Sequence, residues 1–157
     1  MAASTRKFLI VVDDSAEFQA ALRYACQRAR STGGVVAMLR VLPKPEFEHW
    51  SGVREEIERE QRGEAEALLQ KLGVEVQART GRPGEYLIEA GDTVGAIKSV
   101  VAADPEIKIL VLAAATGGRG PGPLVASIAK EGVGFGRKLP VTVVPGDLTD
   151  EEIAMLA

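Results

Sequence analysis

Two short loops carry the residue types that could bind a phosphorylated ligand. The first, Val12-Asp13-Asp14-Ser15, follows an apolar segment, and the carboxylate of Asp13 could accept hydrogen bonds from a ribose or a base edge. The second, residues 115–123, is rich in glycine. Glycine lets backbone N–H groups approach a phosphate without obstruction by Cβ, and an arginine adds several donors. The phosphate contacts would come from Thr116, Gly117, Gly118, Arg119, Gly120 and Gly122.

A helix start next to the second loop would strengthen its attraction for anions. Pro123 suits the first helical position, Ser127 falls in or near the first turn, and a helix N-terminus favours negative charge. The loop is neither a P-loop nor a dinucleotide fingerprint, because it lacks Gly-Lys-Ser/Thr and has Pro123 where a third glycine would stand. The alternative is a stiff connection that binds nothing. For the first loop the alternative is that Asp14 or Ser15 caps the helix that follows, with Asp13 as a solvated charge.

The chain offers little for catalysis or metal binding. Its one cysteine, Cys26, excludes an internal disulfide and a cysteine-based zinc site, and a Ser-His-Asp site would have to use the one histidine, His49. Cys26 falls on the apolar stripe of an expected helix, which favours packing over chemistry. We therefore expect no enzyme activity beyond weak nucleotide hydrolysis.

Composition argues against several other classes of function. Of 157 residues, 46% are hydrophobic and 26% charged, as in ordinary globular proteins, and the net charge is −3. Such a chain lacks the basic face that a general nucleic-acid binder needs. It has no long apolar run and no signal-peptide pattern near Met1, so we expect no membrane span and a cytoplasmic location.

Apolar segments alternate with amphipathic ones along the chain. Strands are expected at 7–12, 35–42, 74–80, 107–113 and 141–144. Helices are expected after a cap at Asp14 or Ser15 to about 31, from Ser51 to 72 where Gly73 ends it, at 85–102 and at 124–137. Residues 147–157 form a helical tail, capped by Thr149 with Glu152. This order predicts one α/β domain over 1–157, an open parallel five-stranded sheet with helices on both faces. Ligands of such sheets bind at the carboxyl ends of the strands, where both loops lie.

Several segments, in their order and spacing, resemble the universal stress protein family. They are Ile10-Val11-Val12-Asp13-Asp14-Ser15, Ala20-Ala21-Leu22-Arg23-Tyr24-Ala25, Gly120-Pro121-Gly122-Pro123-Leu124-Val125 and Leu139-Pro140-Val141-Thr142-Val143-Val144-Pro145-Gly146. The resemblance implies an adenine-nucleotide alpha-hydrolase-like fold with strand order 3-2-1-4-5, a homodimer and, in some members, an adenine nucleotide in the cleft. It also implies that Asp13 contacts the nucleoside and that Val41 lies near the base.

The family's phosphate pattern is present only in part. Nucleotide-binding members carry Gly-x-x-Gly and, nine residues later, Gly followed by Ser or Thr. Gly117 and Gly120 match the first half, but Lys130 and Glu131 occupy the places of the second half. Ser127 lies nearby, out of register with that pattern.

Two functions remain open at this point. In the first, a stress-response protein binds ATP, with Mg²⁺, or AMP between the two loops, through Asp13, Val41, Thr116, Gly117, Gly118, Arg119, Gly120, Gly122 and Ser127. In the second, a regulatory dimer binds no nucleotide and acts on an unknown protein partner, with Phe47–Trp50 as a contact loop or as a seal for the end of the sheet. Dimerisation would pair the strand at 141–144 with its mate at a sheet edge, which the tail 147–157 would otherwise have to cover.

Overall fold

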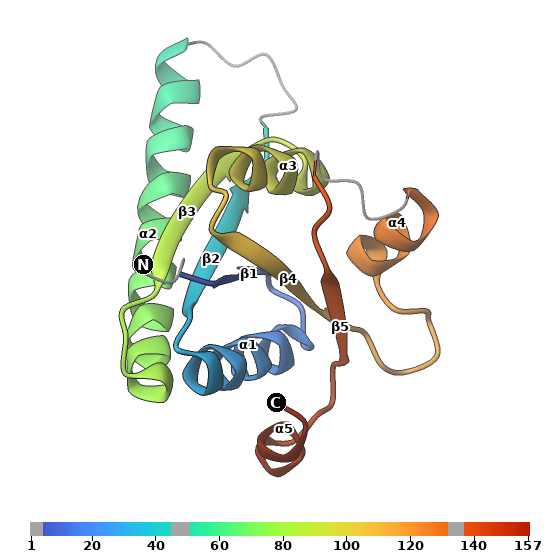
Figure 1. The fold of residues 1–157 in the computed structure, drawn as a ribbon. Coiled ribbons are helices and arrows are strands. Elements are labelled where there is room, and N and C mark those ends of the chain that lie inside the picture. The colour runs from blue at the N-terminus through green and yellow to red at the C-terminus, as the bar shows by residue number, and fades with distance from the viewer. Residues whose placement is uncertain (1–4, 45–50, 132–136) are drawn as a thin grey trace.

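The computed structural model describes residues 5–44, 51–131 and 137–157, which form one five-stranded sheet flanked by helices (Figure 1). All strand pairs are parallel and the order is β3-β2-β1-β4-β5, so the expected α/β fold and strand order are confirmed. The strands are β1 (Lys7–Val11), β2 (Val35–Leu42), β3 (Glu85–Ala90), β4 (Ile107–Ala114) and β5 (Val141–Pro145). The helices are α1 (Phe18–Thr32), α2 (Ser51–Thr80), α3 (Thr93–Ala103), α4 (Pro123–Glu131) and α5 (Asp150–Leu156).

Helices cover both faces of the sheet because its inner strands are apolar on both sides. On one face, Phe8 and Ile10 of β1 pack with buried residues of α1 and α2. On the other face, Leu9 and Val11 pack with α3 and with Ile128 of α4. Successive side chains of a strand point to opposite faces, so a central strand must be apolar throughout. The apolar run near the start of the chain therefore forms the middle of the sheet.

The expected strand at 74–80 is wrong, because these residues form the last turns of α2. Leu72 and Val76 are buried in one core cluster, so the helical spacing continues through Gly73 instead of stopping there. Gly73 makes room for Tyr86 of β3: a Cβ on Gly73 would lie 1.8 Å from the Tyr86 hydroxyl oxygen. Packing of this helix outweighs the cost of about 1 kcal/mol for an interior glycine.

The expected helix at 85–102 is wrong in its first part. Residues 85–90 form β3, which pairs in parallel with β2. α3 starts only at Thr93, because Gly91 adopts a left-handed φ of 118° and Asp92 caps the helix. The Asp92 carboxylate accepts a 2.7 Å hydrogen bond from a backbone N–H of the first turn.

Other boundaries agree with expectation. α1 ends before Gly33, which has a φ of 70°, and α4 begins at Pro123. Thr149 and Glu152 form the expected capping box of α5. Cys26 is 1% exposed in the core between α1 and the sheet, and burial raises the pKa of its thiol to about 12. The cysteine therefore packs, as its place on the apolar stripe predicts.

The C-terminal helix packs against α1. Ser31 donates a 3.3 Å hydrogen bond to the carbonyl oxygen of Ala157, and Arg23 lies 3.5 Å from Asp150. β5 is the last strand on its side of the sheet, and Val143 is 44% exposed. No helix in the described ranges is long and apolar enough to span a membrane.

Two expectations fall outside the described residues. The Phe47–Trp50 loop lies within 45–50, and the second half of the helix expected at 124–137 includes 132–136.

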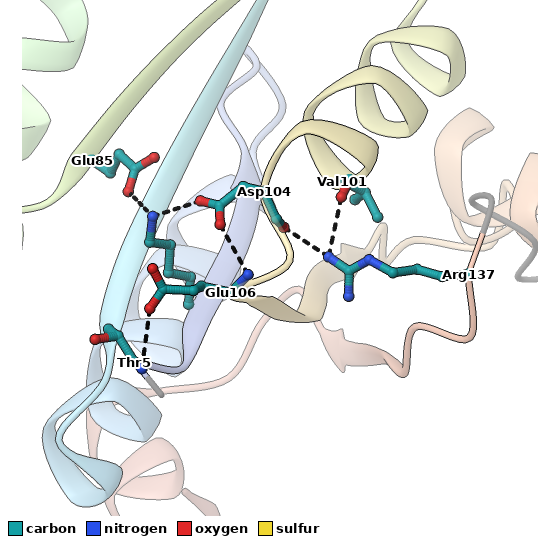
Figure 2. Close-up of polar contacts among 7 residues, drawn as sticks. Thr5, Glu85, Val101, Asp104, Glu106 and Arg137 are labelled. Carbon is teal, nitrogen blue, oxygen red and sulfur yellow. Dashed lines mark hydrogen bonds and ion pairs between the residues drawn. The ribbon is translucent and has the colours of Figure 1, made fainter. Parts of the chain in front are cut away.

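At the amino ends of the strands, Lys7 ties separate elements together (Figure 2). Its ammonium lies 2.5 Å from a carboxylate oxygen of Asp104 and 2.7 Å from one of Glu85. Burial alone would lower the pKa of Lys7, but the hydrogen bonds and charges of the two carboxylates outweigh it and raise the pKa. Burial would raise the pKa of Asp104, yet hydrogen bonds from Lys7 and from the Glu106 N–H lower it. Arg137 completes the cluster by donating to the Asp104 carbonyl oxygen at 2.8 Å.

Candidate functional site

A groove lies where the strand order reverses, at the carboxyl ends of β1 and β4. The helices that follow these two neighbouring strands, α1 and α4, cover opposite faces of the sheet, so a gap is left between them. The groove has a volume of about 550 Å³, which suits a small-molecule ligand. Its wall includes Asp13, Val41 and Ser127. The fold thus brings three of the predicted site residues together from distant parts of the chain.

A smaller hollow of about 120 Å³ lies beside the groove, toward α1. Gly122 and Pro123 line it together with Ser15 and Glu17. Asp13 borders both hollows. Its carboxylate therefore stands between a roomy groove and a narrow recess beside the glycine loop.

A tight turn orients Asp13. One carboxylate oxygen accepts hydrogen bonds from the Ser15 backbone N–H at 3.0 Å and from the Ser15 hydroxyl at 2.5 Å. In the described residues no hydrogen bond engages the second oxygen, and the side chain is exposed. The N-cap of α1 is Glu17, without a side-chain capping bond, so the expectation that Asp14 or Ser15 caps this helix is wrong.

The groove combines an apolar floor with carboxylates along its wall. Val41, Val94 and Leu124 are partly buried against the core on the α3 face, and they offer aliphatic surface to a flat ligand. The carboxylates of Asp13 and Asp92 line the same groove. Carboxylates attract hydroxyl and amino donors and repel phosphate, so this part of the groove suits an uncharged polar group.

Arg40 is a site residue that sequence reasoning missed. Its Nη1 donates a 3.0 Å hydrogen bond to the Val12 carbonyl oxygen, and its Nη2 lies 3.6 Å from an Asp14 carboxylate oxygen. These contacts hold the guanidinium on the wall of the groove and link β2 to the loop after β1. The available signal was a lone charged residue inside the apolar segment 35–42.

Most of the glycine loop stands beside the groove without lining it, although Pro123 at its end lines the groove. Thr116, Gly117, Gly118, Arg119 and Gly120 are exposed and belong to the wall of neither hollow. A 2.9 Å hydrogen bond from the Ala115 N–H to the Pro121 carbonyl oxygen closes the base of the loop. The four glycines at 117, 118, 120 and 122 have φ between 82° and 110°, a region that other residues rarely adopt. The loop geometry therefore requires these glycines.

The start of α4 supplies donors for an anion. The first helical N–H groups have no intrahelical partner, and the residues Leu124 and Val125 line the smaller hollow. The first backbone bond of the helix runs from Ala126 to the Gly122 carbonyl oxygen at 3.0 Å. Negative charge is favoured at such a terminus.

The fold and the groove define a doubly wound α/β protein with a groove at the switch point of the sheet, the place where proteins of this class bind ligands. The model of the Universal stress protein family matches residues 4–145, and the chain belongs to this family. The resemblance seen in the sequence is thereby confirmed. No functionally curated protein matches the chain.

Solved structures share the fold at low identity. Universal stress protein UspA from Lactobacillus plantarum is 19% identical, with a TM-score of 0.70 over 91% of this chain and 99% of that chain. A universal stress protein from Archaeoglobus fulgidus, solved in complex with dAMP, is 19% identical, with a TM-score of 0.60 over 90% and 99%. One solved in complex with cAMP is 15% identical, with a TM-score of 0.61 over 92% and 100%. The adenine-nucleotide alpha-hydrolase-like fold implied by the family resemblance is the one observed.

Proposed function

We propose that this universal stress protein binds an adenine nucleotide, AMP or ATP with Mg²⁺, in the groove between the loops that follow β1 and β4. One observation carries the proposal: Asp13, Val41 and Ser127 line a single groove next to the start of α4. Two proteins of similar structure were solved with dAMP and with cAMP, which supports the same class of ligand here.

The distribution of charge gives the ligand a direction. The base lies on the aliphatic floor at Val41, and the ribose hydroxyls donate to the unused oxygen of Asp13. The phosphates extend from the ribose toward the start of α4 and the glycine loop, past the smaller hollow that Glu17 lines. There, backbone N–H groups, the Ser127 hydroxyl and the Arg119 guanidinium can neutralise them.

Calorimetry with adenosine, AMP and Mg-ATP tests this orientation. Asp13→Ala is expected to weaken all three ligands at least tenfold, because a hydrogen bond to a charged group contributes about 1.5–3 kcal/mol. Arg119→Ala is expected to weaken AMP and ATP and to leave adenosine unchanged. Asp147→Ala, which removes an exposed carboxylate of the last loop, is the matched control and should bind as the wild type does.

Two results would contradict the proposal. One is the absence of saturable binding of any of the three ligands to the wild-type protein. The other is unchanged affinity in Asp13→Ala, which would place the ligand elsewhere. A wild-type protein that binds no nucleotide would favour the second function, a regulatory dimer that acts through its surface.

We also propose that β5 pairs with its mate in a homodimer. An edge strand exposes unpaired backbone groups, and a two-fold axis lets the same strand satisfy them in both copies. Val143 offers exposed apolar surface there. Sedimentation velocity is expected to show a dimer that Val143→Lys dissociates. Val74→Lys, at a valine 73% exposed on α2, is the control and should leave the dimer intact. A monomeric wild-type protein would refute the pairing.

A further inference from the structure

A basic pocket lies at the end of the sheet opposite the groove. It is formed at the amino ends of β1 and β4 and has a volume of about 720 Å³. Four cations line it: Arg6, Arg28, Arg82 and Lys108. No carboxylate belongs to its wall within the described residues. This concentration of positive charge is notable because acidic residues outnumber basic ones in the chain, 22 to 19.

The four cations come from four different elements. Arg6 directly precedes β1, Arg28 lies near the end of α1, Arg82 follows α2, and Lys108 is in β4. Arg82 is fixed in place because its Nη1 donates a hydrogen bond to the Gly33 carbonyl oxygen. A planar guanidinium held at one nitrogen still presents its remaining donors to a ligand.

A bulge in β4 directs Lys108. Lys7 of β1 is opposite Ile107, but the next residue, Phe8, is opposite Ile109, so Lys108 is an extra residue in the ladder. Ile107 packs in the core on the α3 face and Ile109 against the core on the α1 face, although residues two apart on a regular strand share a face. Bulges of this kind re-aim a side chain and are frequent near functional sites.

The surroundings of Lys7 show how this protein treats a cation that is only structural. Lys7, also at the amino end of the sheet, is paired with the carboxylates of Glu85 and Asp104 (Figure 2). In the part of the chain that the structure describes, none of the four cations of the basic pocket takes part in an ion pair. The dipole of α1 stabilises positive charge near the C-terminal end of that helix, where Arg28 lies. It does not account for Arg6 and Lys108, which line the pocket from the strand side.

We propose that the basic pocket binds a short oligophosphate chain, either free or carried by a nucleoside. Several cations around one pocket repel one another until a multivalent anion neutralises them, and guanidinium groups match phosphate oxygens in geometry. Thr5 also lines the pocket and carries a hydroxyl that can donate to a phosphate oxygen, while its backbone N–H donates to the Glu106 carboxylate at 3.1 Å. The volume exceeds that of the groove at the other end, so a chain of phosphates has room.

Calorimetry of the full chain with tripolyphosphate, at low salt and without Mg²⁺, tests the proposal. The wild-type protein is expected to give saturable binding with a Kd below about 1 mM, a free energy of about −4 kcal/mol. The variant Arg28→Gln/Lys108→Met is expected to bind at least tenfold more weakly. The control Arg30→Gln/Lys98→Met removes one exposed cation from the same helix as Arg28 and one from α3, and should change affinity less than twofold.

The following results would overturn the proposal. Absent binding to the wild-type protein would refute it, and equal weakening in both double variants would show diffuse attraction to the surface. Loss of tripolyphosphate binding in Arg119→Ala would assign the phosphates to the glycine loop instead. Backbone amide shifts of the wild-type protein on titration are expected around Arg6, Gly33 and Arg82, and their absence would count against the pocket even if the double variant folds poorly.

Parallel titrations identify the source of the phosphates. Tripolyphosphate binding without ATP binding at the pocket would indicate a free oligophosphate, and equal binding of both, insensitive to Asp13→Ala, would indicate a nucleoside carrier. Because Asp13 belongs to the groove, this variant separates failure at the pocket from failure of the nucleotide site.

Discussion

The replacement Gly73→Ala tests the contact between α2 and β3. An alanine Cβ at this position would lie 1.8 Å from the hydroxyl oxygen of Tyr86 and 2.7 Å from its Cζ. Tyr86 is 46% exposed, so its ring can swing outward, but the ring then loses its packing on the helix. Overpacking costs about 1–3 kcal/mol, and alanine regains about 1 kcal/mol of helix propensity. We expect a net loss of about 1 kcal/mol, which lowers Tm by about 2–4 °C.

A double-mutant cycle, measured by urea and thermal unfolding, isolates the contact. In the Tyr86→Ala background the clash is absent, so Gly73→Ala is expected to stabilise by about 1 kcal/mol, which gives a coupling energy of about 2 kcal/mol. Gly63→Ala is the control, because a Cβ at this glycine of the same helix meets nothing within 4 Å. Gly63→Ala should therefore raise the free energy of unfolding in both backgrounds. An equal effect of Gly73→Ala in both backgrounds would refute the contact and the continuation of α2 through this position.

Three further predictions concern the core and the ends of the sheet. Gly146→Ala would place a Cβ 2.4 Å from the Ala114 carbonyl oxygen, and backbone cannot easily yield, so thermal unfolding should show a loss of about 2 kcal/mol. Lys7→Met should cost about 1–2 kcal/mol at neutral pH, because it leaves carboxylates without their partner. Because folding lowers the pKa of Asp104, this carboxylate stabilises the folded state at pH values above its ordinary pKa of 3.8, and the stabilisation is lost as the pH falls through the pKa of the folded state. The difference in stability between wild type and Lys7→Met should therefore shrink below about pH 4. A difference that stays constant with pH would refute the coupling of Lys7 to Asp104. Cys26, buried and with a pKa near 12, should react with a thiol reagent at neutral pH only in denaturant, and fast labelling of the native protein would contradict its burial.

The central strands and the place of the groove could be predicted from the sequence, because they depend on local pattern. β2 occupies the predicted residues 35–42, and β1 lies within the predicted run 7–12. Once these strands are parallel, their carboxyl ends meet at one edge, so Asp13, Val41 and Ser127 had to lie near one another.

The extent of α2 and the roles of Arg40 and Lys108 could not be predicted, because they depend on contacts between residues distant in the sequence. Gly73 has the local signature of a helix end, and only the ring of Tyr86 shows why a glycine sits inside α2. In the same way, the role of Arg40 depends on the Val12 carbonyl oxygen, 28 positions away, and Lys108 is displaced by a register shift that no pattern of residue types reveals.

The position of β1 has a consequence for how the protein is made. The first strand to be synthesised is the middle one of the finished sheet, and its second neighbour, β4, begins only at Ile107 of 157 residues. A growing chain therefore carries Asp13 beside an unpaired strand edge until β4 has been synthesised. A product that stops before β4 would lack one wall of the groove and would keep one edge of β1 unpaired, a surface prone to aggregation.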